Sequence, residues 1–158
     1  MGFRSFFAKP FAKRVVNKHR LSHQNALERQ DFWLSQHLKK AENTIFGQAF
    51  TFAKIRNYLE FKSIVPIAEY EDLKSYIDEM VKGAENILWP GKPAYFGKTS
   101  GTTSGVKYIP ISKESMPFHI QAARNAILSY INETGKTGFV DGKMIFLQGS
   151  PTLEDKNG

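Results

Sequence analysis

Seven consecutive residues in the middle of the chain carry the side chains best suited to chemistry. The stretch from Thr99 to Gly105 reads TSGTTSG, and Lys107 follows two positions later. Five of the seven residues carry hydroxyl groups, and none has a bulky side chain. Successive backbone N–H groups, short hydroxyl donors and a nearby cation suit a polyphosphate, because glycine lets the backbone approach anionic oxygens closely. The composition leaves a second interpretation open, which is a flexible linker rich in small residues.

Better-known motifs do not fit this stretch. A P-loop needs G-x-x-x-x-G-K-[ST] between a strand and a helix, but the interval from Gly91 to Gly97 is one residue too long and contains a proline. A nucleophile elbow needs G-x-S-x-G, and neither Ser100 nor Ser104 stands in that frame. The four histidines show no spacing typical of a metal site or a catalytic triad. We therefore assign no catalytic residue and no metal ligand.

Two strand-like segments flank the loop and would position it. A segment punctuated by proline and glycine leads into a short strand near Tyr95. After the loop, VKYIPIS has the branched and aromatic composition of a second strand. Linkers do not usually lie between two strands within so short a span, which favours an ordered site.

Helices are expected before and after these strands. Residues 24–41 have helical spacing, and Gly47 offers a stop. YEDLKSYIDEMVKG places Leu73, Tyr76, Ile77 and Met80 on one face, with acids early and Gly83 as a cap. Ser112 can cap a further helix over residues 116–133 that stops at Gly135. That helix is expected to bury Phe118, Ala122, Ala126, Ile127 and Tyr130.

The order of these elements predicts an α/β fold. N-terminal helices come first, and the start of a mixed sheet follows, with a strongly apolar third strand over residues 144–147. Because no helix follows to cover that strand, we expect an incomplete large domain. The expected division is a basic helical region over residues 1–60 and the first part of the large domain over 61–158, with the phosphate loop at 97–107.

The charge of +7 lies entirely in the first region. Residues 1–60 contain 11 Lys/Arg against 4 Asp/Glu, whereas residues 61–158 contain 11 of each. The excess is densest in residues 1–20, and a basic arm of this kind can touch nucleic acid or anionic lipid. However, Pro10 is expected to break any long amphipathic helix there, so we expect the arm to pack on the domain. No apolar run is long enough to span a bilayer, and the absence of cysteine fits a reducing, cytoplasmic location.

Several ordered motifs together resemble one enzyme family. KTSGTTSGVK resembles the phosphate loop of acyl-adenylate-forming enzymes, usually T-S-G-[ST]-T-G-x-P-K. The preceding VPIAEYEDLKSYIDEMVKG and GKPAYFGK look like the GH3 family of acyl-acid amido synthetases, in its bacterial form. The resemblance covers residues 61–112 well and the N-terminal helices loosely. It implies that the chain is the N-terminal part of an adenylate-forming ligase.

The resemblance carries over residue by residue to the loop. The phosphate-binding positions are Thr99, Ser100, Gly101, Thr102, Thr103, Ser104, Gly105 and Lys107. Ser104 stands where the general motif has glycine, and Val106 stands where it has proline, while Lys107 keeps the position of the motif's lysine. The plant branch has its basic residues slightly shifted, which makes Lys107 the residue whose role depends most on the alignment.

The same resemblance implies ATP and Mg²⁺ as cofactors. A small carboxylic acid would be activated as acyl-AMP and its acyl group passed to an amine, such as that of an amino acid. The adenine- and carboxylate-binding motifs belong further along than residue 158, so we expect the fragment alone to be inactive. The alternative is a small basic module that binds phosphate, nucleic acid or membrane without catalysis, although no nucleic-acid motif is present.

Overall fold

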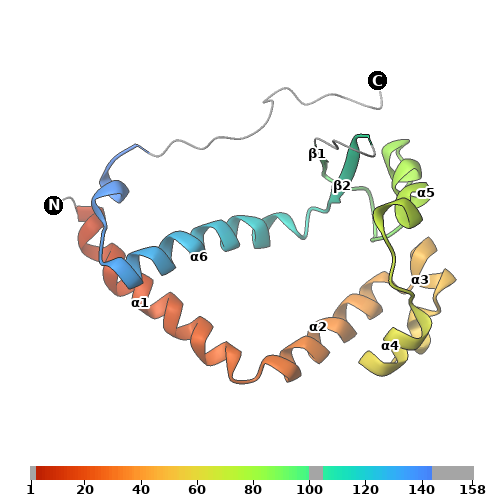
Figure 1. The fold of residues 1–158 in the computed structure, drawn as a ribbon, viewed down its shortest axis with the longest axis horizontal. Helices are drawn as coiled ribbons and strands as arrows, with labels where there is room; N and C mark the ends of the chain where they lie inside the picture. The colour runs from red at the N-terminus through yellow and green to blue at the C-terminus, as the bar shows by residue number, and fades with distance from the viewer. Residues whose placement is uncertain (1–2, 100–104, 144–158) are drawn as a thin grey trace. The chain divides into compact units, whose positions relative to one another are not determined.

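The computed structural model describes residues 3–99 and 105–143. The element order is α1 (Phe3–His23), α2 (Ala26–Ala41), α3 (Ile45–Ala49), η1 (Phe52–Lys54), α4 (Tyr58–Ile64), α5 (Tyr70–Val81), β1 (Tyr95–Thr99), β2 (Lys107–Ile111), α6 (Met116–Thr134) and η2 (Gly138–Asp141). In Figure 1, α1 to α5 precede the two strands, which form an antiparallel sheet, and α6 follows them. The expected order of helices first and then the start of a sheet is confirmed. The third strand expected at 144–147 lies outside the described residues.

The chain folds as two compact units. One consists of residues 27–116, and the other combines the residues before 27 with the described residues after 116. The sheet, α5 and the two ends of the hydroxyl-rich loop all belong to the first unit. The functional boundary expected at residue 60 rests on charge and motif order, and it stays a prediction.

Helix α1 continues through Pro10, so the expectation that this proline breaks the helix is wrong. A proline inside a helix removes one backbone hydrogen bond and crowds the preceding turn. Packing within the unit offsets that cost, because the fully buried Ala12 lies in a cluster with Leu128 and Ile131 of α6. Tertiary contacts thus override the local signal of the proline. The basic arm packs on α6 through this face.

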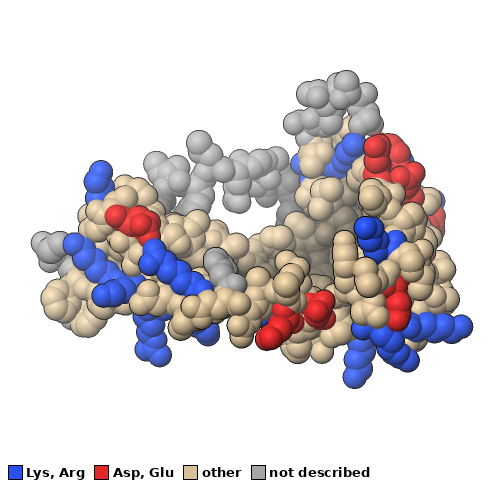
Figure 2. Space-filling model, turned by 60° about the horizontal axis from the view of Figure 1, so that its bottom comes forward, with Lys and Arg blue, Asp and Glu red and all other residues tan. Residues whose placement is uncertain are grey.

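The outward side of α1 mixes aromatic and basic residues. Phe6, Phe7 and Phe11 are exposed, and by helical spacing Arg14 and Lys18 lie on the same side. In the face seen in Figure 2, Lys and Arg side chains are interspersed with uncharged residues. Because Arg14 and Lys18 share the side of Phe7 and Phe11, the aromatic residues of α1 do not form the continuous apolar stripe of an interfacial helix. In the described ranges, we find no helix with the length and apolar character needed to cross a membrane.

The turn between α2 and α3 corrects the role assigned to Gly47. Helix α2 ends at Ala41, and Thr44 then starts α3. The Thr44 hydroxyl donates to the carbonyl oxygen of Ala41 at 2.7 Å and accepts from the Gly47 N–H at 3.0 Å. Gly47 is buried inside α3 and does not terminate α2. A Cβ at Gly47 would lie 2.0 Å from the Ala41 oxygen, so the turn requires glycine.

Helix α6 begins and ends where expected but buries a different face. The turn that precedes it is closed by Ser112, whose hydroxyl accepts from the Ser115 N–H at 3.1 Å. Gly135 ends the helix with φ +67°, which favours glycine. Leu128 and Ile131 are the buried residues, whereas Phe118 and Tyr130 are exposed. Of the residues expected to be buried, Ile127 is partly buried against the cluster that contains Ala12, and the other four are exposed. The expected face is therefore wrong for those four, because contact with α1 selects the orientation of the helix.

Candidate functional site: a hydroxyl-rich loop on a β-hairpin

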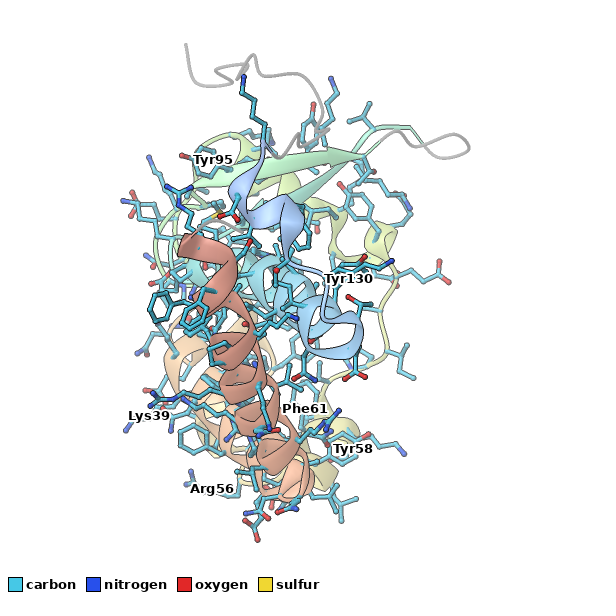
Figure 3. All side chains as sticks on the ribbon, turned by 90° about the vertical axis from the view of Figure 1, so that its left-hand side faces the viewer. Lys39, Arg56, Tyr58, Phe61, Tyr95 and Tyr130 are labelled. Atoms are coloured by element: carbon cyan, nitrogen blue, oxygen red, sulfur yellow. The ribbon has the colours of Figure 1, made fainter. Side chains whose placement is uncertain are left out.

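The two ends of the hydroxyl-rich loop are held by an antiparallel hairpin. Its register pairs Tyr95 with Ile111 at one end and Thr99 with Lys107 at the other. Figure 3 marks Tyr95, where β1 starts. Because directly opposed residues of a pleated pair project to the same face, Thr99 and Lys107 lie side by side where the loop leaves the sheet. The expectation of two strands around the loop is confirmed.

The predicted binding residues fall into two groups. Thr99, Gly105 and Lys107 are described, and they lie at the ends of the loop. Ser100, Gly101, Thr102, Thr103 and Ser104 lie outside the described residues, so their role stays a prediction. Gly105 has φ +83°, and a Cβ built there would meet nothing within 4 Å. The backbone at this end of the loop thus takes a conformation suited to glycine, with open space beside it.

Lys107 is the cation predicted to bind phosphate, and two residues of helix α5 contact its side chain. Its ammonium lies 5.0 Å from the centre of the Tyr70 ring and 4.0 Å from a carboxylate oxygen of Glu71. The Lys107 side chain is 33% exposed and that of Glu71 is 53% exposed. The first contact is a cation–π interaction and the second a long, solvated ion pair. Both partners come from the first turn of α5.

Tyr70 also binds the backbone beside Lys107. The Tyr108 N–H donates to the Tyr70 hydroxyl at 2.9 Å, across 38 residues of sequence. The rings of Tyr108 and Phe96 pack edge to face across the hairpin, with centroids 6.3 Å apart. One tyrosine of α5 therefore fixes both the start of β2 and the side chain of its first residue. Figure 1 shows α5 beside the hairpin.

The sequence of α5 explains why its first turn faces the hairpin. A capping box joins Glu69 and Asp72, and the Asp72 carboxylate accepts from the Glu69 N–H at 2.8 Å. The expected apolar face is confirmed, with Ile77 and Met80 buried. This face anchors the helix, and the capping box fixes where it begins. Tyr70 and Glu71 follow directly as the first two residues of the helix.

The outer charges of α5 are paired within the helix. Lys74 contacts Asp78 at 2.5 Å and Lys82 contacts Glu79 at 2.8 Å. The hydrogen bond to Asp78 raises the pKa of the Lys74 ammonium, and the hydrogen bond to Glu79 raises the pKa of Lys82 in the same way. Glu71 differs from these acids, since its ion pair is with a residue of β2.

Reasoning from the sequence missed Tyr70 and Glu71 as part of the site. It treated them only as the start of a helix. The available signal was a hydroxyl-bearing aromatic residue followed by an acid at the helix start. That signal has no spacing relation to Lys107, because the contact is tertiary. Only the fold brings these residues together.

The hairpin, both ends of the loop and α5 lie within residues 16–158, which match the model of a single N-terminal domain. That model describes the GH3 family N-terminal domain, and the chain belongs to the GH3 family. The resemblance inferred from the loop and its flanking motifs is thereby confirmed.

The sequence of this chain is similar to those of two named plant proteins. Over 94 residues, or 58% of this chain, the sequence is 32% identical to the Arabidopsis thaliana protein "Indole-3-acetic acid-amido synthetase GH3.15". Over 58 residues, or 35% of this chain, it is 41% identical to the Oryza sativa subsp. japonica protein "Probable indole-3-acetic acid-amido synthetase GH3.13". The chain spans 16% of the length of the first relative and 12% of the length of the second.

Proposed function

We propose that this chain is the N-terminal part of an ATP-dependent ligase that activates a carboxylic acid as acyl-AMP and passes the acyl group to an amine. The observation that carries the proposal is the GH3 family match over residues 16–158, which includes the hydroxyl-rich loop and its hairpin. Both named relatives are described as amido synthetases. We therefore propose that the product is an amide, formed between the activated acid and an amine.

The described residues fit a polyphosphate. The cation of Lys107 and the hydroxyl of Thr99 lie where the loop leaves the sheet, and Gly105 leaves space for a close approach to the backbone. Once a nucleotide is bound, donors held in this way would stabilise the charge that develops during the reaction. Mg²⁺ fits as the companion of ATP, because it prefers phosphate oxygens and water to an all-protein cage.

The proposed reaction has two steps. When bound, ATP supplies an electrophilic α-phosphorus and pyrophosphate as the leaving group. A carboxylate oxygen bonds to that phosphorus as the bond to pyrophosphate breaks; an amine nitrogen then bonds to the acyl carbon, releasing AMP and a proton. Lys107 and the loop would bind the β- and γ-phosphates while their charge grows in the first step. ATP, Mg²⁺, the acid and the amine are all proposals for this chain.

A small basic module remains the competing function. The basic surface of α1 is the feature that favours it, since phosphates attract such a surface. A module of this kind gives no reason for the GH3 family match, and it requires no hydrolysable nucleotide. The ligase therefore converts ATP into AMP and pyrophosphate, whereas the binding module forms no product from ATP.

Oxygen labelling tests the proposed reaction class. The full-length protein is incubated with ATP, Mg²⁺, an amine and an acid labelled with ¹⁸O in its carboxylate. Attack at the α-phosphorus transfers one label to AMP, which mass spectrometry detects. Label in inorganic phosphate would indicate attack at the γ-phosphorus, and AMP without label would indicate hydrolysis. Either of these results would overturn the proposed reaction.

A further inference from the structure

Lys107 already has an anionic partner in the structure. The carboxylate of Glu71 lies 4.0 Å from its ammonium, where a phosphate oxygen would compete for the same cation. Both side chains are partly exposed, and ion pairs of this kind are weak. The Tyr70 ring, 5.0 Å from the ammonium, gives Lys107 a contact that does not involve Glu71. An ammonium has three donors, so it can keep one neighbour while it exchanges another.

We propose that Tyr70 and Glu71 position Lys107 and that Glu71 acts as an exchangeable stand-in for phosphate. This inference rests on the proposed function of the loop. Tyr70 retains the lysine through its ring and retains the adjoining backbone through its bond to the Tyr108 N–H. Glu71 holds the ammonium while no nucleotide is bound, and it gives up the ammonium when phosphate arrives. The pair thereby lowers the affinity of the site for ATP and speeds the release of pyrophosphate.

The charge of Glu71 is the reason for this direction of effect. A carboxylate within reach of Lys107 repels an incoming phosphate and competes for the same donor. Removing that charge frees Lys107 and removes the repulsion. Binding of ATP and of pyrophosphate should therefore become tighter. A residue that served only to stabilise the fold would not strengthen ligand binding when it was changed.

The chain offers a matched control on the same helix. Glu79 is 55% exposed and forms an ion pair with Lys82, whereas Glu71 is 53% exposed and forms one with Lys107. Glu71→Gln and Glu79→Gln thus remove the same charge at similar exposure. Only Glu71→Gln removes the ion-pair partner of Lys107, the residue next to the loop. Comparison of the two variants separates the site effect from the general effect of charge.

The experiment measures carboxylate-dependent ATP–pyrophosphate exchange by the full-length protein. Glu71→Gln is expected to lower the KM for ATP and the inhibition constant of pyrophosphate by about two- to fivefold, the range expected for one exposed ion pair. Glu79→Gln should leave both constants unchanged. In a Lys107→Gln background, Glu71→Gln should lose most of its effect, because its partner is absent. Thermal melting shows whether each variant is folded.

Tyr70 gives a second, independent readout. Tyr70→Phe keeps the ring over Lys107 but removes the hydroxyl that accepts from the Tyr108 N–H. Tyr70→Leu removes both contacts. We expect the KM for ATP to rise more in Tyr70→Leu than in Tyr70→Phe, because only the leucine variant loses the cation–π contact.

The possible results distinguish a failure of this inference from a failure of the proposed function on which it rests. If the wild type shows exchange and Lys107→Gln weakens it, but Glu71→Gln behaves like Glu79→Gln, the exchange role of Glu71 is wrong and the ligase stands. An increase in the KM for ATP in Glu71→Gln would also overturn that role. Absence of exchange in the wild type with every acid tested would overturn both the proposed function and the inference that rests on it.

Discussion

Lys107→Gln is expected to lower the rate of acyl-adenylate formation by the full-length ligase by about ten- to a hundredfold. A charge-assisted hydrogen bond contributes about 1.5–3 kcal/mol, and that loss in the transition state corresponds to this factor. Lys107 lies directly across the hairpin from Thr99, where the loop leaves the sheet. The measurement is kcat/KM for ATP in pyrophosphate exchange, with Lys113→Gln as a control for charge on the exposed segment beyond β2.

The loop itself should respond in a graded way. Thr102→Ala removes one hydroxyl donor and is expected to lower the rate of acyl-adenylate formation by a similar factor. Gly101→Val should be worse, because a β-branched side chain blocks the approach of phosphate and restricts the backbone. Unchanged exchange in all three variants, Lys107→Gln included, would show that the stretch is a linker. Thermal melting is the control that separates loss of binding from loss of folding.

Gly47→Ala is expected to destabilise the unit that carries the hairpin by about 3 kcal/mol or more. A Cβ at Gly47 would lie 2.0 Å from the carbonyl oxygen and 2.9 Å from the carbonyl carbon of Ala41. Both atoms belong to the backbone, so no side-chain rotation can relieve the overlap. Thr44, which is 1% exposed, holds both sides of this turn and prevents the backbone from opening.

Denaturation by urea measures this effect, with Gly138→Ala as the matched control. A Cβ built at Gly138 meets nothing within 4 Å. Both substitutions reduce the conformational freedom of the unfolded chain equally, so that contribution cancels. Equal midpoints for the two variants would show that the turn between α2 and α3 adapts, contrary to this account.

Local signals in the sequence were sufficient for the elements around the site. Helix α5 was predictable because capping acids, a regular apolar face and a final glycine agree in one short segment. The hairpin was predictable because branched and aromatic residues flank a stretch of turn-forming ones. Val65 precedes a proline, which disfavours the helical conformation, and it is extended at the end of α4. In these segments, each residue's local preference agrees with the tertiary structure.

Other features depend on contacts distant in sequence. Pro10 lies inside α1 because the buried Ala12 packs against α6. The same contact selects Leu128 as a buried residue of α6 and leaves Phe118 exposed. Tyr70 meets the Tyr108 backbone across 38 residues, with no spacing rule to reveal it. A single sequence contains no signal that identifies such partners in advance.

In the proposed function, this chain supplies the phosphate loop of an acyl-adenylate-forming ligase. Carboxylate-dependent ATP–pyrophosphate exchange by the full-length protein tests it most directly, with labelled pyrophosphate and a panel of small acids that includes indole-3-acetic acid. We predict that label enters ATP only when a suitable acid and Mg²⁺ are present, and that Lys107→Gln lowers its rate. Exchange that is independent of any acid, or equal in wild type and Lys107→Gln, would contradict the account.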